Sequence, residues 1–321
     1  MSFAVKNITI GGYKFALHGL SEDDPYFAGI GENAESEFYE ICRGFVPEDS
    51  VCLDIGANIG LKTLFLSRHL SGGQVIAIEA APKVGECLER NVAVNHARNV
   101  TVEHIAIGDR SGVTNFADTS AYGHISENGV EVAVTTMPAL IERLGLSRVD
   151  FIKIDVEGFE FPILKNSIDT INQMESLVVL EFNSWCQIVY SNTSPREFIA
   201  WILDNFEFVF IVKRGGAGES LLERIGKDDS IRLLRQNIME DGCVTDLMVT
   251  NSARRLDPSP QFLMRQLSAA VAARDAAIAE CERVTAEREA AIAERNALLA
   301  STSWKVTEPL RRLATAFPRT R

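Results

Sequence analysis

The stretch Val51-Cys-Leu-Asp-Ile-Gly-Ala-Asn-Ile-Gly60 decides the fold of this chain of 321 residues. Val51 to Ile55 is a short apolar run with Asp54 near its end, followed by a glycine turn and a helical pattern from Leu61. This order predicts a buried strand, a tight loop and the first turn of a helix. Such a loop lets a ligand approach the backbone, and the free N–H groups at the helix start favour an anionic group.

A second apolar run, Gln74 to Ile78, ends in Glu79. In nucleotide-binding α/β folds, an acid at the tip of the second strand, about 20 residues past the glycine loop, holds the ribose hydroxyls. The loop and Glu79 together predict a site for an adenosine-containing cofactor. For the loop alone, a glycine turn without a ligand is the alternative, and Glu79 argues against it.

The loop sequence distinguishes two adenosine cofactors. A nicotinamide dinucleotide needs Gly-x-Gly-x-x-Gly, because its pyrophosphate lies against bare backbone, and the middle and last glycines are absent here. Asp54 would repel a pyrophosphate but attract an ammonium, and S-adenosylmethionine carries an ammonium and no phosphate. We therefore predict S-adenosylmethionine, with its methionine end at Asp54 and the loop, its ribose at Glu79 and its adenine near Ile107 and Asp109. The predicted cofactor-binding residues are Asp54, Gly56, Ala57, Asn58, Gly60, Glu79, Ala80, Ile107 and Asp109.

Composition excludes several other classes of protein. A hydrophobic fraction of 46% and a charged fraction of 24% are typical of a soluble globular chain. The net charge of −12 argues against nucleic acid as a partner, because phosphate binding needs a basic face. The six cysteines have no framework spacing, and no apolar stretch is long enough to span a bilayer. We expect a cytoplasmic protein with free thiols.

Apolar runs alternate with helical patterns along the middle of the chain. This alternation implies a parallel sheet with right-handed crossovers and with ligands at the carboxyl ends of the strands. We predict strands at 51–55, 74–79, 100–107, 150–155 and 176–182, and helices at 61–70, 82–96, 160–173 and 195–204. A final antiparallel pair, 206–212 with 244–250, is a feature of methyltransferase sheets more than of nicotinamide ones. The predicted fold class is α/β, with a doubly wound, mostly parallel sheet.

The N-terminal segment precedes this sheet. Residues 1–20 have the pattern of a β-hairpin with a Gly-Gly turn. Residues 21–47 are acidic and predict a helix from about Glu35 to Arg43, which would cover the mouth of the cofactor site. Glu35 and Glu37 are either contacts to the cofactor or solvated surface acids.

Three residues are candidates for handling the proton of an acceptor. Residues 111–136 predict an inserted hairpin whose long tip carries His124, a candidate base or an exposed histidine with no role. Asp155, Glu157 and Glu160 place three acids within six residues beside the cofactor site, which is costly unless they meet a cation or a proton. Asp155 is expected either to hold the methionine ammonium of the cofactor or to orient the hydroxyl of the acceptor. Glu157 is a candidate for the proton, or it favours the start of a helix, which is the only role expected for Glu160.

A metal-assisted reaction is the alternative mechanism. Asp155, Glu181 and Asn183 fall at two adjacent strand ends, where catechol-type methyltransferases place the oxygen ligands of a divalent ion. A hard cation there would lower the pKa of a hydroxyl. The spacing gives this weak support, so a divalent metal is not expected and its ligands stay unassigned.

Several motifs, in order along the chain, resemble the FkbM family of S-adenosylmethionine-dependent methyltransferases. The similarity covers about residues 45–185 and implies a class I methyltransferase (Rossmann-like) fold and O-methylation of a hydroxyl. The sequence departs from the family at two places. Ala80-Ala81-Pro82 stands where the family commonly has Glu-Pro followed by a polar residue, and Leu61-Lys62 stands where the family frequently has aromatic residues. The motifs are Leu53-Asp-Ile-Gly-Ala-Asn-Ile-Gly60, Val75-Ile-Ala-Ile-Glu79, Arg90-Asn91 with Asn95, Ala106-Ile-Gly-Asp109 and Ile152-Lys-Ile-Asp-Val-Glu-Gly158.

The expected function is methyl transfer from S-adenosylmethionine to a hydroxyl, on a sugar of a bacterial surface polysaccharide or its precursor. The enzyme must align the acceptor and remove its proton, through Asp155 or Glu157, with His124 as a further candidate. Another hydroxyl-bearing small molecule or glycan is open as the acceptor. The alternative function is a non-catalytic, cofactor-binding platform subunit of a glycan-assembly complex, acting through its C-terminal helix.

The C-terminal part has a different composition. Residues 262–300 are Ala-rich heptads in which one seam position is apolar and the next carries three arginines, so either a homodimeric coiled coil or a lone helix is consistent with them. The tail resembles segments of surface-polysaccharide enzymes, and from residue 302 it has five basic side chains and one acid. It is either a solvated tail or a contact to an assembly partner or to the inner membrane surface. The predicted domains are 1–47, the hairpin and cap; 48–255, the methyltransferase domain; 262–300, the heptad helix; and 301–321, the basic tail.

Overall fold

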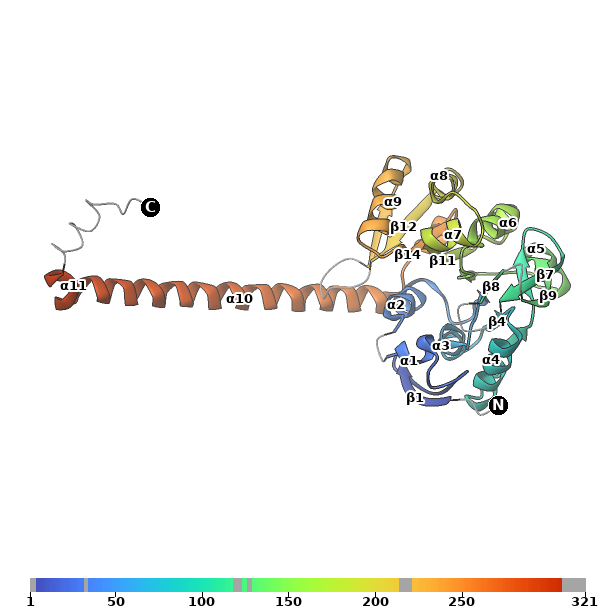
Figure 1. Ribbon diagram of the computed structural model, residues 1–321, viewed down its shortest axis with the longest axis horizontal. Helices are drawn as coiled ribbons and strands as arrows, with labels where there is room; N and C mark the ends of the chain where they lie inside the picture. The colour runs from blue at the N-terminus through green and yellow to red at the C-terminus, as the bar shows by residue number, and fades with distance from the viewer. Residues whose placement is uncertain (1–3, 32–33, 118–122, 126–128, 214–220, 308–321) are drawn as a thin grey trace. The chain divides into compact units, whose positions relative to one another are not determined.

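The computed structural model describes residues 4–31, 34–117, 123–125, 129–213 and 221–307 (Figure 1). Two compact units divide the chain, one formed by 1–215 with 220–264 and the other by 216–219 with 265–321. The first unit is an α/β domain, and the second is mainly one long helix. Within the described residues, no helix combines the length and the apolar character needed to cross a membrane.

The domain is built on an eight-stranded sheet in the order β13-β12-β14-β11-β10-β3-β4-β5. Neighbouring strands from β5 to β11 are parallel, and β14 lies antiparallel between β11 and β12. The order reverses beside β3, as in doubly wound folds. This confirms the predicted class I methyltransferase (Rossmann-like) fold with its antiparallel C-terminal strands. The strands are β3 Val51–Ile55, β4 Gln74–Ile78, β5 Val100–Glu103, β10 Phe151–Ile154, β11 Leu177–Asn183, β12 Phe208–Val212, β13 Leu222–Ile225 and β14 Val244–Thr250.

Both faces of the sheet are buried, because alternate residues of each strand enter two different clusters. Cys52 and Val75 belong to one cluster with side chains of α2, α3 and α4. Leu53 and Ile76, their neighbours in sequence, belong to the other cluster with side chains of α5, α6, α8 and α9. The helices are α2 Ser36–Phe45, α3 Leu61–His69, α4 Pro82–Val94, α5 Met137–Arg143, α6 Glu160–Met174, α8 Pro195–Asn205 and α9 Ser230–Met239.

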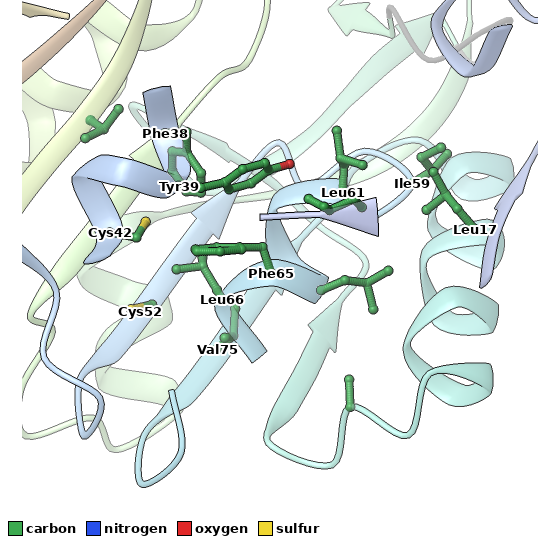
Figure 2. Close-up of a cluster of buried hydrophobic side chains, with 14 of the residues drawn as sticks. Leu17, Phe38, Tyr39, Cys42, Cys52, Ile59, Leu61, Phe65, Leu66 and Val75 are labelled. Carbon is green, nitrogen blue, oxygen red and sulfur yellow. The ribbon is translucent and has the colours of Figure 1, made fainter. Parts of the chain in front are cut away.

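Helix α2 packs on α3 through aromatic side chains. The rings of Tyr39 and Phe65 lie 4.3 Å apart, with Phe38 beside them (Figure 2). The predicted N-terminal hairpin is confirmed as β1 Ala4–Ile10 and β2 Tyr13–Gly19. Asn91 of α4 and Asn95, which caps the end of α4, are buried and bond to the backbone of this hairpin. Their side-chain oxygens accept from the N–H groups of His18 at 2.7 Å and Ala16 at 3.0 Å. These contacts seat the N-terminal segment on the domain.

The predicted strand at 100–107 is wrong as a single element. Strand β5 ends at Glu103, opposite the last residue of β4, so no neighbour in the main sheet remains for its extension. The chain continues as β6 Ala106–Gly108, which pairs in parallel with β9 Val130–Thr136 of the predicted insertion. Strands β7 Gly112–Ala117 and β8 His124–Ile125 complete this second sheet. Much of the predicted hairpin tip, 118–122 and 126–128, lies outside the described residues. Short helices that the pattern did not predict include α1 Pro25–Gly29, α5 and α7 Ser184–Val189.

The predicted heptad helix is confirmed as α10 Pro260–Ala300, followed by α11 Thr302–Val306. Phe262 at its start is buried against Phe45 of α2. From Arg265 onward every residue of α10 whose side chain is described is exposed, including the apolar seam residues Val271, Ile278, Ile292 and Leu299. The basic tail from residue 308 lies outside the described residues.

Candidate functional site

A pocket of about 230 Å³ opens where the carboxyl ends of β3, β4 and β10 converge, the position that the strand order predicts for a ligand. It combines loop backbone, apolar side chains and a charged end. Its wall includes eight of the twelve residues predicted to bind the cofactor or to act on the acceptor. These eight are Gly56, Ala57, Asn58, Glu79, Ala80, Ile107, Asp155 and Glu157.

The β3–α3 loop is shaped by left-handed backbone at Gly56, Asn58 and Gly60, whose φ angles are 76°, 54° and 96°. The N–H groups of Gly56 and Ala57 donate to the carbonyl of Ile78, at 3.0 and 2.9 Å, and tie the loop to β4. A Cβ at position 56 would collide with the carbonyl oxygen of Asp155, just after β10. Glycine is therefore required there both for its φ and for the close approach of the two strand ends.

The variant Gly56→Ala is expected to lower the free energy of unfolding by roughly 3 kcal/mol or more, because backbone strain and the clash with Asp155 add. Gly145 is a matched control, since its φ is +63° but nothing lies within 4 Å of an added Cβ. Gly145→Ala should cost only about 1 kcal/mol, from its backbone conformation alone. Urea unfolding of both variants measures the difference, and equal costs would contradict the close approach.

Glu79 links the loop to the pocket. Its Oε2 accepts from the N–H of Asn58 and its Oε1 from the N–H of Ala81, both at 2.8 Å. Burial raises the pKa of the Glu79 carboxyl, although the two backbone hydrogen bonds lower it. Each carboxylate oxygen retains a second lone pair, so Glu79 can hold the loop and still accept hydrogen bonds from a ligand's hydroxyls.

Asp54 does not lie on the pocket wall, contrary to the prediction that it meets the cofactor. Its carboxylate is fully buried, accepts a hydrogen bond from the hydroxyl of Thr63, and lies 3.3 Å from the ammonium of Lys153. Lys153 also donates to the carbonyl of Gly56, at 2.6 Å. The chain therefore supplies its own cation to Asp54, and the carboxylate holds β3, β10 and the loop together.

Two other predicted cofactor residues lie away from the pocket wall. Gly60 precedes α3, where an added Cβ would lie 2.7 Å from Leu88 of α4. Asp109 follows β6 and is exposed, with its backbone carbonyl accepting from Asn166 at 3.1 Å. Both are accounted for by local structure, namely a close helix contact and a turn.

Asp155 is paired with two lysines at the charged end of the pocket. Its Oδ2 lies 3.4 Å from the ammonium of Lys62 and 3.5 Å from that of Lys153, and Lys62 also lies 3.1 Å from Glu35. Burial would raise the pKa of Asp155, but the lysines outweigh it and hold the pKa below its usual range. Lys153 could have been found in the sequence, because the period of 2 places it on the same face of the strand as Asp155. Lys62 and Tyr26 also line the pocket, but no pattern in the sequence indicates them.

Glu157 has a different environment. It has a left-handed backbone with φ 53°, lines the pocket, and accepts a hydrogen bond from the thiol of Cys186 at 3.1 Å. Burial and the neighbouring charge of Asp155 raise its pKa. Glu160 does more than favour a helix start, because it is fully buried and its Oε1 accepts from the N–H groups of Val156 and Gly158, at 3.0 and 3.2 Å. It holds the turn that presents Glu157, and burial raises its own pKa to about 7.

His124 lies beside the pocket. Its neighbour Gly123 lines the wall, and the imidazole stacks on the ring of Tyr190 with centroids 3.8 Å apart. Of Asp155, Glu181 and Asn183, the residues considered for a metal-assisted reaction, Asn183 uses its side chain for hydrogen bonds within the protein. Asn183 uses its side-chain oxygen to accept from the N–H of Cys186 at 3.0 Å, and its amide donates to Glu181 at 3.2 Å. Across the described ranges, no three His, Cys, Asp or Glu side chains are grouped as a metal site.

Comparison with known proteins finds similarity to methyltransferases. Residues 54–210 match the family model described as the methyltransferase FkbM domain. The chain is 25% identical over 199 residues to Methyltransferase 1 of Beauveria bassiana, covering 50% of this chain and 79% of that protein. It is 25% identical over 181 residues to Methyltransferase sdnD of Sordaria araneosa, covering 44% and 69%. A third relative, AMB antimetabolite synthetase AmbE of Pseudomonas aeruginosa, is 25% identical over 214 residues, which are 53% of this chain but 10% of that protein.

Solved structures with a similar fold include the methyltransferase FkbM from Methylobacillus flagellatus KT, at 17% identity and a TM-score of 0.38, covering 63% of this chain and 44% of that chain. The 16S rRNA N2 G1207 methyltransferase RsmC of T. thermophilus has 12% identity and a TM-score of 0.43, covering 78% and 51%. The fold assignment depends on the strand order and not on these likenesses, whose scores are low. The match to the FkbM domain and the two relatives named as methyltransferases support a methyltransferase family for this chain.

Proposed function

We propose that this protein is an S-adenosylmethionine-dependent O-methyltransferase that acts on a hydroxyl of a sugar in a bacterial surface polysaccharide or its precursor. One observation carries the cofactor assignment: the pocket at the reversal of strand order brings together the bare backbone of the glycine loop and the carboxylate of Glu79. The similarity of the chain to methyltransferases supports the reaction class.

The residues present fit S-adenosylmethionine. Glu79 is placed to accept the ribose hydroxyls, and Ile78, Val84 and Ile107 offer an apolar wall for the adenine. At the other end the carboxylates of Glu35, Asp155, Glu157 and Glu181 outnumber the ammonium groups of Lys62 and Lys153. This surplus of carboxylates favours a cationic ligand, because a cation stabilises their ionised forms. When bound, the cofactor supplies an electrophilic methyl group on its sulfonium.

The chain must then orient the acceptor and remove the hydroxyl proton. Asp155 is neutralised by two lysines and has a lowered pKa, which makes it a weak base and a positioning residue. Glu157 has a raised pKa and lines the same pocket, so it is the stronger base near neutral pH. We therefore assign removal of the hydroxyl proton to Glu157. His124 lies beside the same pocket.

Calorimetric titration of the full chain with S-adenosylmethionine, and separately with NAD, tests the cofactor assignment. Micromolar binding of S-adenosylmethionine alone is the expected result. A folded protein that binds neither S-adenosylmethionine nor S-adenosylhomocysteine would overturn the enzyme assignment.

We also propose that α10 pairs in parallel with a second copy of the chain. Its apolar seam residues are exposed, and the other seam position runs Leu267, Arg274, Cys281, Arg288, Arg295. Asp275 and Glu289 each follow a seam arginine directly, at a position that borders the seam of a parallel partner. The arginines can therefore pair with acids of the other chain.

In this arrangement the two Cys281 thiols face each other across the seam. Mild oxidation is expected to give a disulfide-linked dimer in the wild type and none in Cys281→Ser, because Cys281 is the exposed cysteine among those described. Cys243→Ser is the control and should cross-link normally. A monomer in sedimentation at micromolar concentration, with no cross-link, would refute the pairing.

A further inference from the structure

The short helix α7, Ser184–Val189, has its polarity reversed. Trp185, Ile188 and Val189 are 52%, 59% and 52% exposed, and their spacing places them on one face of the helix. The opposite face is buried and consists of Ser184, Cys186 and Gln187. An ordinary surface helix buries its apolar face and exposes its polar one. An apolar face turned to solvent marks a binding surface.

Helix α7 packs beside the pocket through its buried face. Helix α7 directly follows β11, which carries Glu181 on the pocket wall. The Cys186 thiol contacts Glu157, and a Cβ on Gly158 would lie 2.7 Å from the carbonyl of Cys186, so the turn of Glu157 packs on the backbone of α7.

Aromatic rings extend the apolar face toward the second sheet. Tyr190, directly after α7, stacks on His124 and meets Trp185 edge to face, with centroids 5.4 Å apart. The neighbour of His124, Gly123, lines the pocket. The apolar surface and the candidate base therefore border the same opening.

We propose that the outer face of α7, formed by Trp185, Ile188 and Val189, binds an uncharged apolar group that the acceptor carries next to its reacting hydroxyl. The inference rests on the proposed function and makes the acceptor an amphiphile: a hydroxyl-bearing head at Glu157 and an alkyl or aryl group on α7. Burying the three side chains under such a group removes apolar surface from water. An anionic group is disfavoured, because it would lie close to the carboxylates of Glu157 and Glu181 on the pocket wall.

The test compares octyl and methyl β-D-glucopyranoside, which share a head and differ in the apolar group. Both are titrated by calorimetry into the full chain loaded with S-adenosylhomocysteine, with the octyl compound below its micelle-forming concentration. The wild type is expected to bind the octyl compound at least tenfold more tightly. In Ile188→Asn the ratio should fall to near one. Ile231→Asn on α9 is the matched control, since Ile231 is 60% exposed, and it should keep the wild-type ratio.

Equal binding of the two glucosides by the wild type, or an unchanged ratio in Ile188→Asn, would overturn the proposal. The same would follow if Ile188→Asn instead abolished binding to phosphatidylglycerol vesicles or dissociated an oligomer, because a membrane or a second copy would then cover α7. Retained S-adenosylhomocysteine binding with no octyl preference removes this inference alone. Loss of S-adenosylhomocysteine binding in the wild type removes the proposed function itself.

Discussion

Glu79→Ala is expected to raise the dissociation constant for S-adenosylmethionine by roughly 100-fold or more, to the point where calorimetry detects no binding. Charge-assisted hydrogen bonds contribute about 1.5–3 kcal/mol each, and the variant removes those from Glu79 to the ligand. It also frees the N–H groups of Asn58 and Ala81, which the carboxylate holds at 2.8 Å, so the loop loses its support.

Two control variants make this result specific. Glu79→Gln keeps the shape and one acceptor oxygen, and an intermediate affinity is expected. Asp109→Ala should leave the affinity unchanged, because Asp109 is exposed and does not line the pocket. Circular dichroism establishes that each variant is folded. Undiminished binding by folded Glu79→Ala would show that the pocket does not hold an adenosine at this residue.

Glu157→Gln is expected to lower kcat by roughly 10²–10⁴-fold, the usual contribution of a general base, with little change in S-adenosylmethionine affinity. Turnover is measured as release of S-adenosylhomocysteine, with an acceptor selected by screening hydroxyl compounds against the wild type. Because the pKa of Glu157 is raised, the base is deprotonated only above the ordinary value of 4.5. The wild-type rate should therefore rise with pH, and the midpoint of this rise should lie above the ordinary pKa of a glutamate. This limb of the pH profile should be absent in Glu157→Gln.

Asp155→Asn serves as the comparison. It removes the charge shared by Lys62 and Lys153, so we expect a loss of roughly 1–3 kcal/mol in the free energy of unfolding while the limb of the pH profile is retained. If the limb instead disappears in Asp155→Asn and persists in Glu157→Gln, the assignment of the base is reversed.

The sequence alone determined the elements and their order. A period of 2 or 3.6 in apolar residues, together with glycine turns, is a local property, and it correctly predicted β3, α3, β4 and the doubly wound sheet. The acid at the end of the second strand is also a matter of local spacing, and Glu79 lies on the pocket wall. The strand at 100–107 was predicted wrongly, because its length depends on whether a neighbouring strand continues beside it.

Only the tertiary structure decided which carboxylates in the pocket region pair with a lysine of the chain and which do not. Asp54 and Asp155 cannot be distinguished by their chemistry in the sequence. In the structure Asp54 pairs with Lys153, and Asp155 pairs with both Lys153 and Lys62. Glu157 instead accepts a hydrogen bond from the thiol of Cys186. The apolar face of α7 likewise gains a functional meaning only because Tyr190 connects it to His124 beside the pocket. Charge pairing and burial depend on residues that are distant in the sequence, such as Lys62 and Asp155, and these meet only when the sheet assembles.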